Sequence, residues 1–132
     1  MSTLVRVARE KGTSGYVGDG SNRWPSVHRL DAARVVRLAL EKAPACSVVH
    51  AVAEEGIPTR DIAEVIGRHL DVPVVSVAPE DAAEHFGWIG AFFALNVHAS
   101  SAFTQQLLGS TPTHPGLLDN LEAGYYFHTA SA

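Results

Sequence analysis

The segment from residue 24 to residue 43 constrains the fold more than any other part of the chain. A short apolar stretch, Trp24 to Val27, carries His28 into a turn. Asp31 then precedes a helical run over residues 32–43. An aspartate in this position accepts hydrogen bonds from the free N–H groups of a first helical turn. We therefore expect a short strand that leads into a helix capped by Asp31.

The two segments that follow are unusually apolar for elements on a protein surface. The helix over residues 32–43 has apolar residues around more than one stripe, which favours a helix that is covered on more than one side. The run Ser47–Ala53 lacks clean alternation of apolar and polar residues, a pattern typical of a strand buried on both faces. Such a strand needs neighbours, because an open edge pairs with other chains.

Three glycines near the start have the spacing G-x-x-G-x-x-G: Gly12, Gly15 and Gly18. A dinucleotide-binding loop with this spacing must follow a buried strand and lead into a helix. Here the glycines follow a helix predicted from Ser2 or Thr3 to Gly12. We therefore interpret them as the end of that helix, followed by a hairpin turn over residues 19–22.

The rest of the chain shows the same alternation of short elements. Strands are expected over residues 14–18, 24–28 and 72–77, and helices over 59–69, 79–87, 88–95 and 100–108, with a last helix from Pro115. The fold class is α/β, an α+β-like small domain with a few short strands and about five or six helices. Residues 1–128 form one domain, and residues 129–132 are a loose tail.

Composition excludes several classes of function. The net charge is −4 and the sequence pI is about 5.9, so the chain lacks the basic surplus of a nucleic-acid binder. Cys46 is alone, and the seven histidines lack the short spacing of a zinc helix, so we expect neither a disulfide nor a metal. No signal peptide or membrane-length apolar run is evident, which favours a cytoplasmic location without membrane contact.

Several motifs together carry a resemblance to a known family. Val27, His28, Asp31 and Ala33 match the pattern VH-x-x-D-x-A, and Thr59, Ile62, Ala63, Ile66, Gly67 and Leu70 match T-x-x-I-A-x-x-I-G-x-x-L. The chain thus resembles the extended and atypical short-chain dehydrogenases/reductases, the NAD-dependent epimerase/dehydratase group. Residues 100–117 resemble the family's closing segment, although Ser110 stands where the family has Trp.

The resemblance covers only the C-terminal, substrate-binding part of that family. Its nucleotide-binding Rossmann domain precedes this part, and the chain before Trp24 is too short to contain it. The family's catalytic pair is Tyr-x-x-x-Lys, but Tyr16, Tyr125 and Tyr126 have no Lys four residues later. We therefore assign no catalytic, cofactor-binding or metal-binding residue in this chain alone. The resemblance implies NAD or NADP for the complete family enzyme.

Five residues are candidates for a substrate pocket: Trp24, His28, Arg29, Trp88 and Phe92. Trp24 is either a core anchor or a pocket wall. In the family, the residue matching His28 helps to hold the junction between the two lobes. Arg23 or Arg29 either meets an anionic substrate group or is a solvated side chain. The apolar run over residues 88–95 predicts a buried helix that lines a substrate pocket or an oligomer surface.

Two hypotheses about function follow. In the first, the chain is the substrate-binding lobe of an NAD(P)-dependent oxidoreductase or epimerase, present as a fragment or truncated protein and inactive alone. Its partner is then a separate nucleotide-binding lobe, and its ligand a small molecule. In the second, the chain is a self-associating binding or assembly module that kept the fold without catalysis, and it forms homo-oligomers through the surface that the missing sheet once covered.

Overall fold

Each short strand pairs with a strand that is distant in the sequence. In the computed structural model, which describes residues 1–128, β1 (Ser14–Val17) lies parallel to β4 (Val74–Val77). Strand β2 (Arg23–Ser26) lies antiparallel to β3 (Glu54–Pro58), with Trp24 opposite Ile57. The tail predicted over residues 129–132 lies outside the described residues.

Helices make up most of the remaining regular structure. They are α1 (Ser2–Lys11), α2 (Arg29–Lys42), α3 (Thr59–Leu70), α4 (Ala82–Phe86), α5 (Gly90–Phe93), α6 (Ala102–Leu108) and α7 (Leu117–Glu122), with 3-10 turns η1 (Pro79–Asp81) and η2 (Gly87–Ile89). The predicted fold class, a small α/β protein with a few short strands, is confirmed. None of the helices among residues 1–128 is long and apolar enough to cross a membrane.

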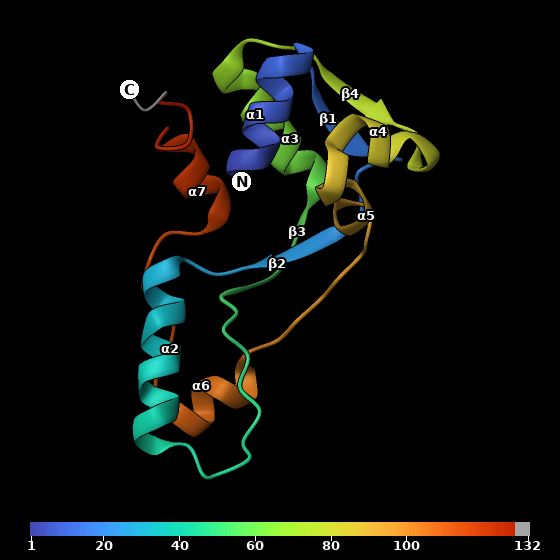
Figure 1. Ribbon diagram of the computed structural model, residues 1–132. Helices are drawn as coiled ribbons and strands as arrows, with labels where there is room; N and C mark the ends of the chain where they lie inside the picture. Colours follow the sequence, from blue (N-terminus) through green and yellow to red (C-terminus); the bar gives the residue numbers. More distant parts are fainter. Residues whose placement is uncertain (129–132) are drawn as a thin grey trace.

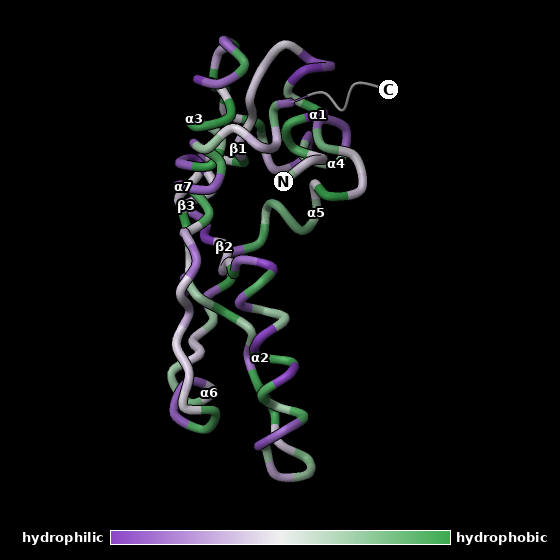
Figure 2. Tube along the Cα trace, turned by 90° about the vertical axis from the view of Figure 1, so that its left-hand side faces the viewer, coloured by the Kyte–Doolittle hydropathy of each residue, from purple (hydrophilic) through white to green (hydrophobic). Residues whose placement is uncertain are grey.

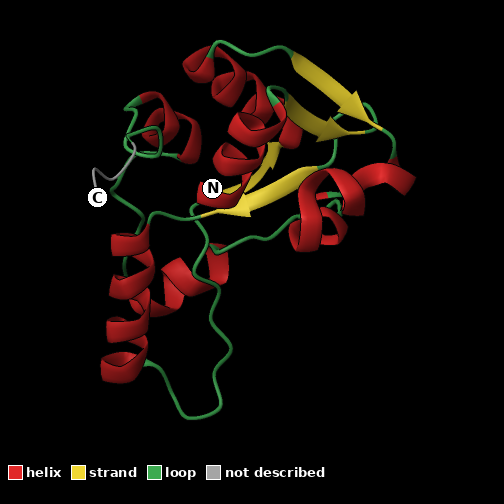
Figure 3. Cartoon of the chain, turned by 45° about the horizontal axis from the view of Figure 1, so that its top comes forward, coloured by secondary structure: helices red, strands yellow, loops and turns green. Residues whose placement is uncertain are grey.

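The molecule has two regions, which we call the body and the arm. The body comprises residues 1–26, 54–97 and 117–128, and the arm comprises residues 27–53 and 98–116. Figure 1 shows α2 and α6 extending away from the strands and from the other helices. In Figure 3, the strands all lie in the body, and the arm consists of helices and loops.

The body contains most of the hydrophobic core. Helix α3 is amphipathic and buries one face, in which Ile62 and Ile66 are at most 2% exposed. Phe93 from α5 and Leu121 from α7 reach the same cluster and are also almost completely buried. The core therefore joins segments from both ends of the chain around β1 and β4.

The arm has a much smaller core. Leu38 of α2 and Leu108 of α6 are buried, together with the polar Ser101 and Thr104. Many other apolar positions along α2 remain in contact with solvent, and Figure 2 shows how far this helix stands from the body. The prediction that α2 is covered on more than one side is therefore wrong for this chain.

The predicted hairpin is also wrong, although its two strands exist. Gly18 and Gly20 have positive φ angles of 61° and 72°, and Asp19 accepts hydrogen bonds from Ser21. This turn directs the chain from one strand pair to the other instead of folding β2 back on β1. The true partners, β4 and β3, come much later in the sequence, so local turn signals could not identify them.

Helix α2 begins earlier than predicted, and Asp31 does not cap it. The N-cap residue is His28, whose Nδ1 accepts a hydrogen bond from Leu30 N at 3.2 Å. The carboxylate of Asp31 instead accepts hydrogen bonds from Thr113 and His114. Asp31 therefore bonds to residues that are distant in the sequence instead of to the first turn of α2.

Two predicted buried elements are exposed in the structure. Residues 47–53 form a loop rather than a strand, and Val48 is 73% exposed. The segment over residues 88–95 splits into η2 and α5, with Ile89 and Phe93 buried but Trp88 and Phe92 largely exposed. Both predictions took apolar sequence as a sign of burial. In these two segments, the other described residues do not cover the apolar side chains.

Of the context predicted for the three glycines, the helix end at Gly12 is confirmed. Gly12 ends α1 in the left-handed conformation, with φ 65°. Gly15 lies inside β1, where an added Cβ would come within 2.9 Å of His85 Nε2 and Phe86 Cζ. This packing leaves no room for a pyrophosphate at Gly15.

Candidate functional site

Three of the five predicted pocket residues lie side by side on the body. The indole Nε1 of Trp24 donates a hydrogen bond to the Phe92 carbonyl oxygen at 3.1 Å. Trp88 and Phe92 form an edge-to-face pair with ring centroids 6.4 Å apart. Trp24 itself is half-buried and packs edge-on against Phe93, with centroids 5.2 Å apart. Trp24 therefore supports the group from behind, and the other two rings face outward.

Four outward-facing side chains of this segment are large and apolar. Trp88 is 71% exposed, Phe92 56%, Leu95 51% and Val97 40%. We call these four residues the apolar surface. A cluster of large exposed apolar side chains marks an interaction site in proteins more often than scattered ones do.

The backbone beneath the apolar surface is held in place by hydrogen bonds. The Asn22 side-chain amide donates to the carbonyl oxygens of Phe93 and Leu95 at 2.8 and 3.0 Å. Val97 N donates to the Arg23 carbonyl oxygen at 2.8 Å, and Ala99 N donates to that of Glu55 at 3.1 Å. The surface therefore has a fixed backbone and ends where the chain crosses into the arm.

The other two predicted pocket residues lie at the start of α2. His28 is half-buried and Arg29 is exposed. His28 stacks on His114, with ring centroids 4.6 Å apart and an interplanar angle of 7°. Arg23, the other cation considered, donates from its guanidinium to the Gly56 carbonyl oxygen at 3.0 Å. The five predicted residues therefore belong to two separate places rather than to one pocket.

The stacked histidines belong to a polar cluster that sequence reasoning missed. We call it the junction cluster: His28, Asp31, Thr113 and His114. Asp31 is only 3% exposed. Its carboxylate accepts hydrogen bonds from the backbone N–H groups of Thr113 and His114, and from His114 Nδ1 at 2.8 Å. Burial alone would raise the pKa of Asp31, but the bonds from His114 and Thr113 outweigh it and lower the pKa to about 2.

The junction cluster fixes how the chain returns from the arm to the body. Because the carboxylate of Asp31 can only accept, Nδ1 is the donor of His114 in this bond. Nearby, the Glu54 carboxylate accepts from Ser26 Oγ at 2.6 Å and from Leu117 N at 2.7 Å. Two carboxylates thus hold the segment over residues 113–117. No local pattern signals these contacts, since Asp31 and His114 are 83 positions apart.

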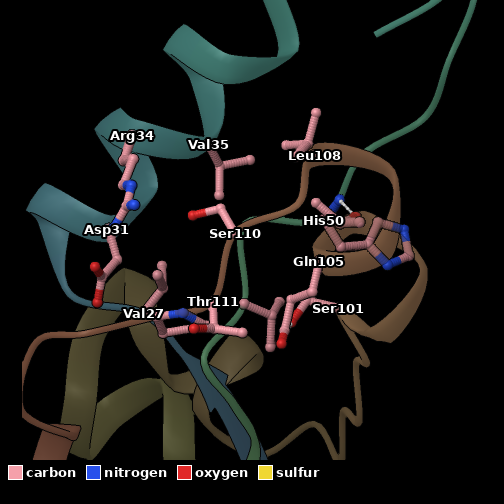
Figure 4. A pocket seen from close by; sticks show the side chains of 13 residues that line it. Val27, Asp31, Arg34, Val35, His50, Ser101, Gln105, Leu108, Ser110 and Thr111 are labelled. Carbon is pink, nitrogen blue, oxygen red and sulfur yellow. Dashed lines mark hydrogen bonds between the residues drawn. The ribbon is translucent and has the colours of Figure 1, made fainter. Parts of the chain in front are cut away.

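The arm encloses a small cavity between α2 and α6. Figure 4 shows Val35 and Leu108 facing it from the two helices, with Asp31 and Arg34 on the same stretch of α2. Its volume of about 20 Å³ suits a water molecule and excludes an organic ligand.

A wider and more open depression lies on the body beside β4, lined by Lys11, Ser76, Asp81, Glu84 and His85 among others. His85 Nε2 is buried there without a hydrogen-bond partner. Burial, and then the charge of Lys11, lower the pKa of His85. The ring is therefore held neutral. Within residues 1–128, no group of three or more His, Cys, Asp or Glu side chains is placed to bind a metal.

Comparison with known sequences finds two similar fungal proteins without an assigned activity. The chain is 52% identical over 124 residues to an uncharacterized protein of Schizosaccharomyces pombe, covering 94% of this chain and 42% of that protein. It is 47% identical over 122 residues to an uncharacterized protein of Saccharomyces cerevisiae, covering 92% and 41%. The chain therefore spans about two fifths of the length of these relatives. No protein-family profile matches it.

Comparison with solved structures identifies the fold. DesIV (dTDP-glucose 4,6-dehydratase) from Streptomyces venezuelae, with NAD and TYD bound, superposes with a TM-score of 0.64 at 21% identity, over 91% of this chain and 35% of that one. RMD from Pseudomonas aeruginosa, complexed with NADPH, gives 0.62 at 16% identity, over 92% and 38%. The fold is thus that of one part of these two longer chains, whose structures hold NAD and NADPH.

Proposed function

We propose that this chain is the substrate-binding lobe of an NAD(P)-dependent oxidoreductase or epimerase and that it is inactive without a nucleotide-binding lobe. Two findings support the proposal. The fold is similar to part of two longer proteins that hold NAD and NADPH. The chain also matches only about two fifths of each fungal relative, which leaves room for a nucleotide-binding part in those proteins.

The observation that carries the proposal is the uncovered face of α2. Leu30, Val36 and Leu40 are 52%, 59% and 85% exposed and, at helical spacing, lie on one side of α2 with Ala33. The buried residues Asp31 and Leu38 lie on the other side, toward α6 and the junction cluster. A helix with apolar residues on two sides is suited to lie between two layers. Here only one layer is present among the described residues.

The loop over residues 47–53 supports the same interpretation. Its sequence is that of a doubly buried strand, yet Val48 is 73% exposed and the segment has no strand partner among the described residues. An added parallel sheet would satisfy both its backbone and its side chains. The nucleotide-binding lobe proposed here would supply such a sheet.

Self-association is the second candidate, and the same exposed face favours it. Two copies that packed their α2 helices together would cover Val36 and Leu40 without any other lobe. In that case, the protein would be a binding or assembly module that forms homo-oligomers, and it would need no nucleotide.

A reconstitution experiment separates the two candidates. The part of the Schizosaccharomyces pombe relative that this chain does not match would be co-expressed with the chain, and NADH and NADPH would be titrated into the product. We expect a one-to-one complex that binds a nicotinamide cofactor, whereas this chain alone binds neither. Cofactor binding by the chain alone, or a stable homodimer that excludes the added part, would contradict the proposal.

A further inference from the structure

The cap at the start of α2 is made by a histidine, a residue type that changes charge near neutral pH. His28 Nδ1 accepts a hydrogen bond from Leu30 N at 3.2 Å, and the His28 carbonyl oxygen accepts one from Ala32 N at 2.9 Å. Helices are usually capped by Ser, Thr, Asp or Asn. A histidine accepts through Nδ1 only while its ring is neutral, because both ring nitrogens are donors in the protonated form. The side-chain cap of α2 therefore requires a neutral His28.

The ring that stacks on His28 can take up a proton without losing its own hydrogen bond. His114 Nδ1 donates to Asp31 at 2.8 Å, which leaves Nε2 for an added proton. Burial alone would raise the pKa of Asp31, but the hydrogen bonds from His114 and Thr113 lower it to about 2, so this carboxylate stays charged in weak acid. The His114 side chain is 34% exposed, so solvent reaches it. A proton on His114 is therefore balanced by the charge of Asp31.

A proton on His28 has three unfavourable consequences in the same arrangement. Leu30 N loses its acceptor. The new positive charge lies at the N-terminus of α2, where the helix dipole is also positive. It also lies against the ring of His114, with the ring centroids 4.6 Å apart. The capped helix is therefore compatible with one proton added to the stacked pair and disfavours a second.

The charged groups around the stacked rings leave this balance in place. Asp31 is already paired with His114, and the Glu54 carboxylate already accepts hydrogen bonds at 2.6 and 2.7 Å from the two segments beside it. Arg29 and Arg34, the cations near the start of α2, oppose a further positive charge. Acid therefore favours a state in which His28 leaves the stack and α2 loses its cap.

Loss of the cap affects the returning segment because Asp31 belongs to the turn that His28 caps. Asp31 is the third residue of α2, and its carboxylate holds the backbone N–H groups of Thr113 and His114. These bonds join the start of the arm to the segment through which the chain returns to the body. A first turn that frays therefore loosens both crossings together.

We propose that the stacked pair of His28 and His114 is an acid-sensitive latch, which holds the arm to the body while His28 is neutral and releases it when His28 takes up a proton. Histidine changes charge between about pH 5 and pH 8, so the cap contributes fully at the upper end of that range and is lost toward the lower end. Helix α2 also carries the face that the proposed second lobe covers. Assembly with that lobe should therefore weaken when the latch opens, and this consequence alone rests on the proposed function.

The test follows the histidine ring nitrogens and the backbone amides of the ¹⁵N-labelled chain by NMR at about pH 7.5 and about pH 5. At the higher pH, we expect the ring proton of His28 on Nε2 and that of His114 on Nδ1, so the two rings have opposite tautomers. At the lower pH, the protection of the Leu30 and Ala32 amides against exchange should fall about fivefold, the effect of losing one N-cap.

The variant His28→Asn separates the cap from the charge. Asparagine caps a helix through an oxygen that does not titrate, so this variant should keep the Leu30 amide protected at both pH values. His28→Ala should lose the protection at both. His98→Asn is the matched control, because it makes the same substitution at an exposed histidine outside the junction cluster, and the loss of protection in acid should remain.

Three results would overturn the inference: a neutral His28 ring with its proton on Nδ1, equal protection of Leu30 at both pH values in the unchanged chain, or a loss in acid that persists in His28→Asn. The measurements use the chain alone and need no second lobe. If the latch responds as expected but the reconstitution gives no complex, only the proposed function fails. If the complex forms and the latch does not respond to acid, only this inference fails.

Discussion

The body and the arm have similar proportions of apolar residues, but they bury them to different extents. In the body, the apolar faces of α1, α3 and α5 meet around β1 and β4 and become buried. In the arm, α2 and α6 bury one face each, whereas Val36 and Leu40 of α2 and Val48 of the following loop are largely exposed. The same kind of sequence thus gives a closed core in one region and an open surface in the other. The body holds most of the buried core, and under the proposed function the arm is the region that a second lobe covers.

The largest expected effect comes from the body core. Phe93→Ala should lower the free energy of unfolding by about 3–5 kcal/mol, because it opens a cavity beside Trp24 and Phe86. Phe92→Ala is the matched control one residue away, where the ring is 56% exposed, and it should change stability little. Urea unfolding followed by circular dichroism measures both. Equal losses in the two variants would mean that the body core is misplaced.

The next effect concerns the junction between the two regions. Asp31→Asn should cost about 2 kcal/mol, because the charged acceptor for Thr113 and His114 is lost inside the protein. Hydrogen exchange should quicken in α2 and in residues 110–116 and remain unchanged in α3. If exchange rose equally in α3, the junction cluster would not act as a local clamp.

The same cluster predicts how stability responds to acid. The pKa of Asp31 is lowered to about 2 in the folded protein from an unfolded value of 3.8. Its contribution is therefore complete above the unfolded value and is lost as the pH falls from about 4 toward 2. The Asp31→Asn variant should lose less stability over that range than the unchanged protein does. Parallel acid-unfolding curves for the two proteins would contradict this role.

A smaller pH effect is expected from His85. Burial and Lys11 lower its pKa, so the folded protein favours the neutral ring while the unfolded chain takes up a proton below about pH 6.5. Stability should therefore decrease as the pH falls below that value, and His85→Leu should reduce this slope. His98→Leu, at an exposed position, is the control. An unchanged slope in His85→Leu would show that the ring does not titrate as described.

The smallest effect on stability is expected in the arm. Val48→Asp should change the free energy of unfolding of the isolated chain by no more than about 0.5 kcal/mol, because the side chain is 73% exposed. The same change should abolish assembly with the complementary part of the Schizosaccharomyces pombe relative. Tyr125→Asp, at an equally exposed position on the body, should leave assembly intact. Assembly that tolerates Val48→Asp would place the contact elsewhere.

Local sequence signals predicted the body well. Helical spacing and a glycine stop placed α1, α3 and β4 within a few residues, and Gly12 ends α1 in the left-handed conformation, as glycine allows. The predictions that failed concern contacts between residues distant in the sequence. The hairpin was wrong because β1 pairs with β4, and the cap was wrong because Asp31 turns toward His114.

The errors in the arm have a different cause. Hydrophobicity over residues 47–53 and along α2 predicted burial, and the described residues provide nothing to bury them. The apolar pattern in these two segments therefore marks exposed apolar surface rather than a buried element of this chain. At the candidate site, Trp88 and Phe92 were predicted to lie together and do, whereas His28 and Arg29 lie at the junction, which depends on contacts across more than 80 positions.

Hydrogen–deuterium exchange of the chain, with and without the complementary part of the fungal relative, tests the central claim most directly. Exchange should slow in residues 29–53 when the parts are mixed, because the exposed face of α2 and the loop over residues 47–53 become covered. Exchange in α1 and α3 should stay the same. Unchanged exchange throughout the arm, or protection confined to the body, would contradict the claim that the arm is the docking surface for a nucleotide-binding lobe.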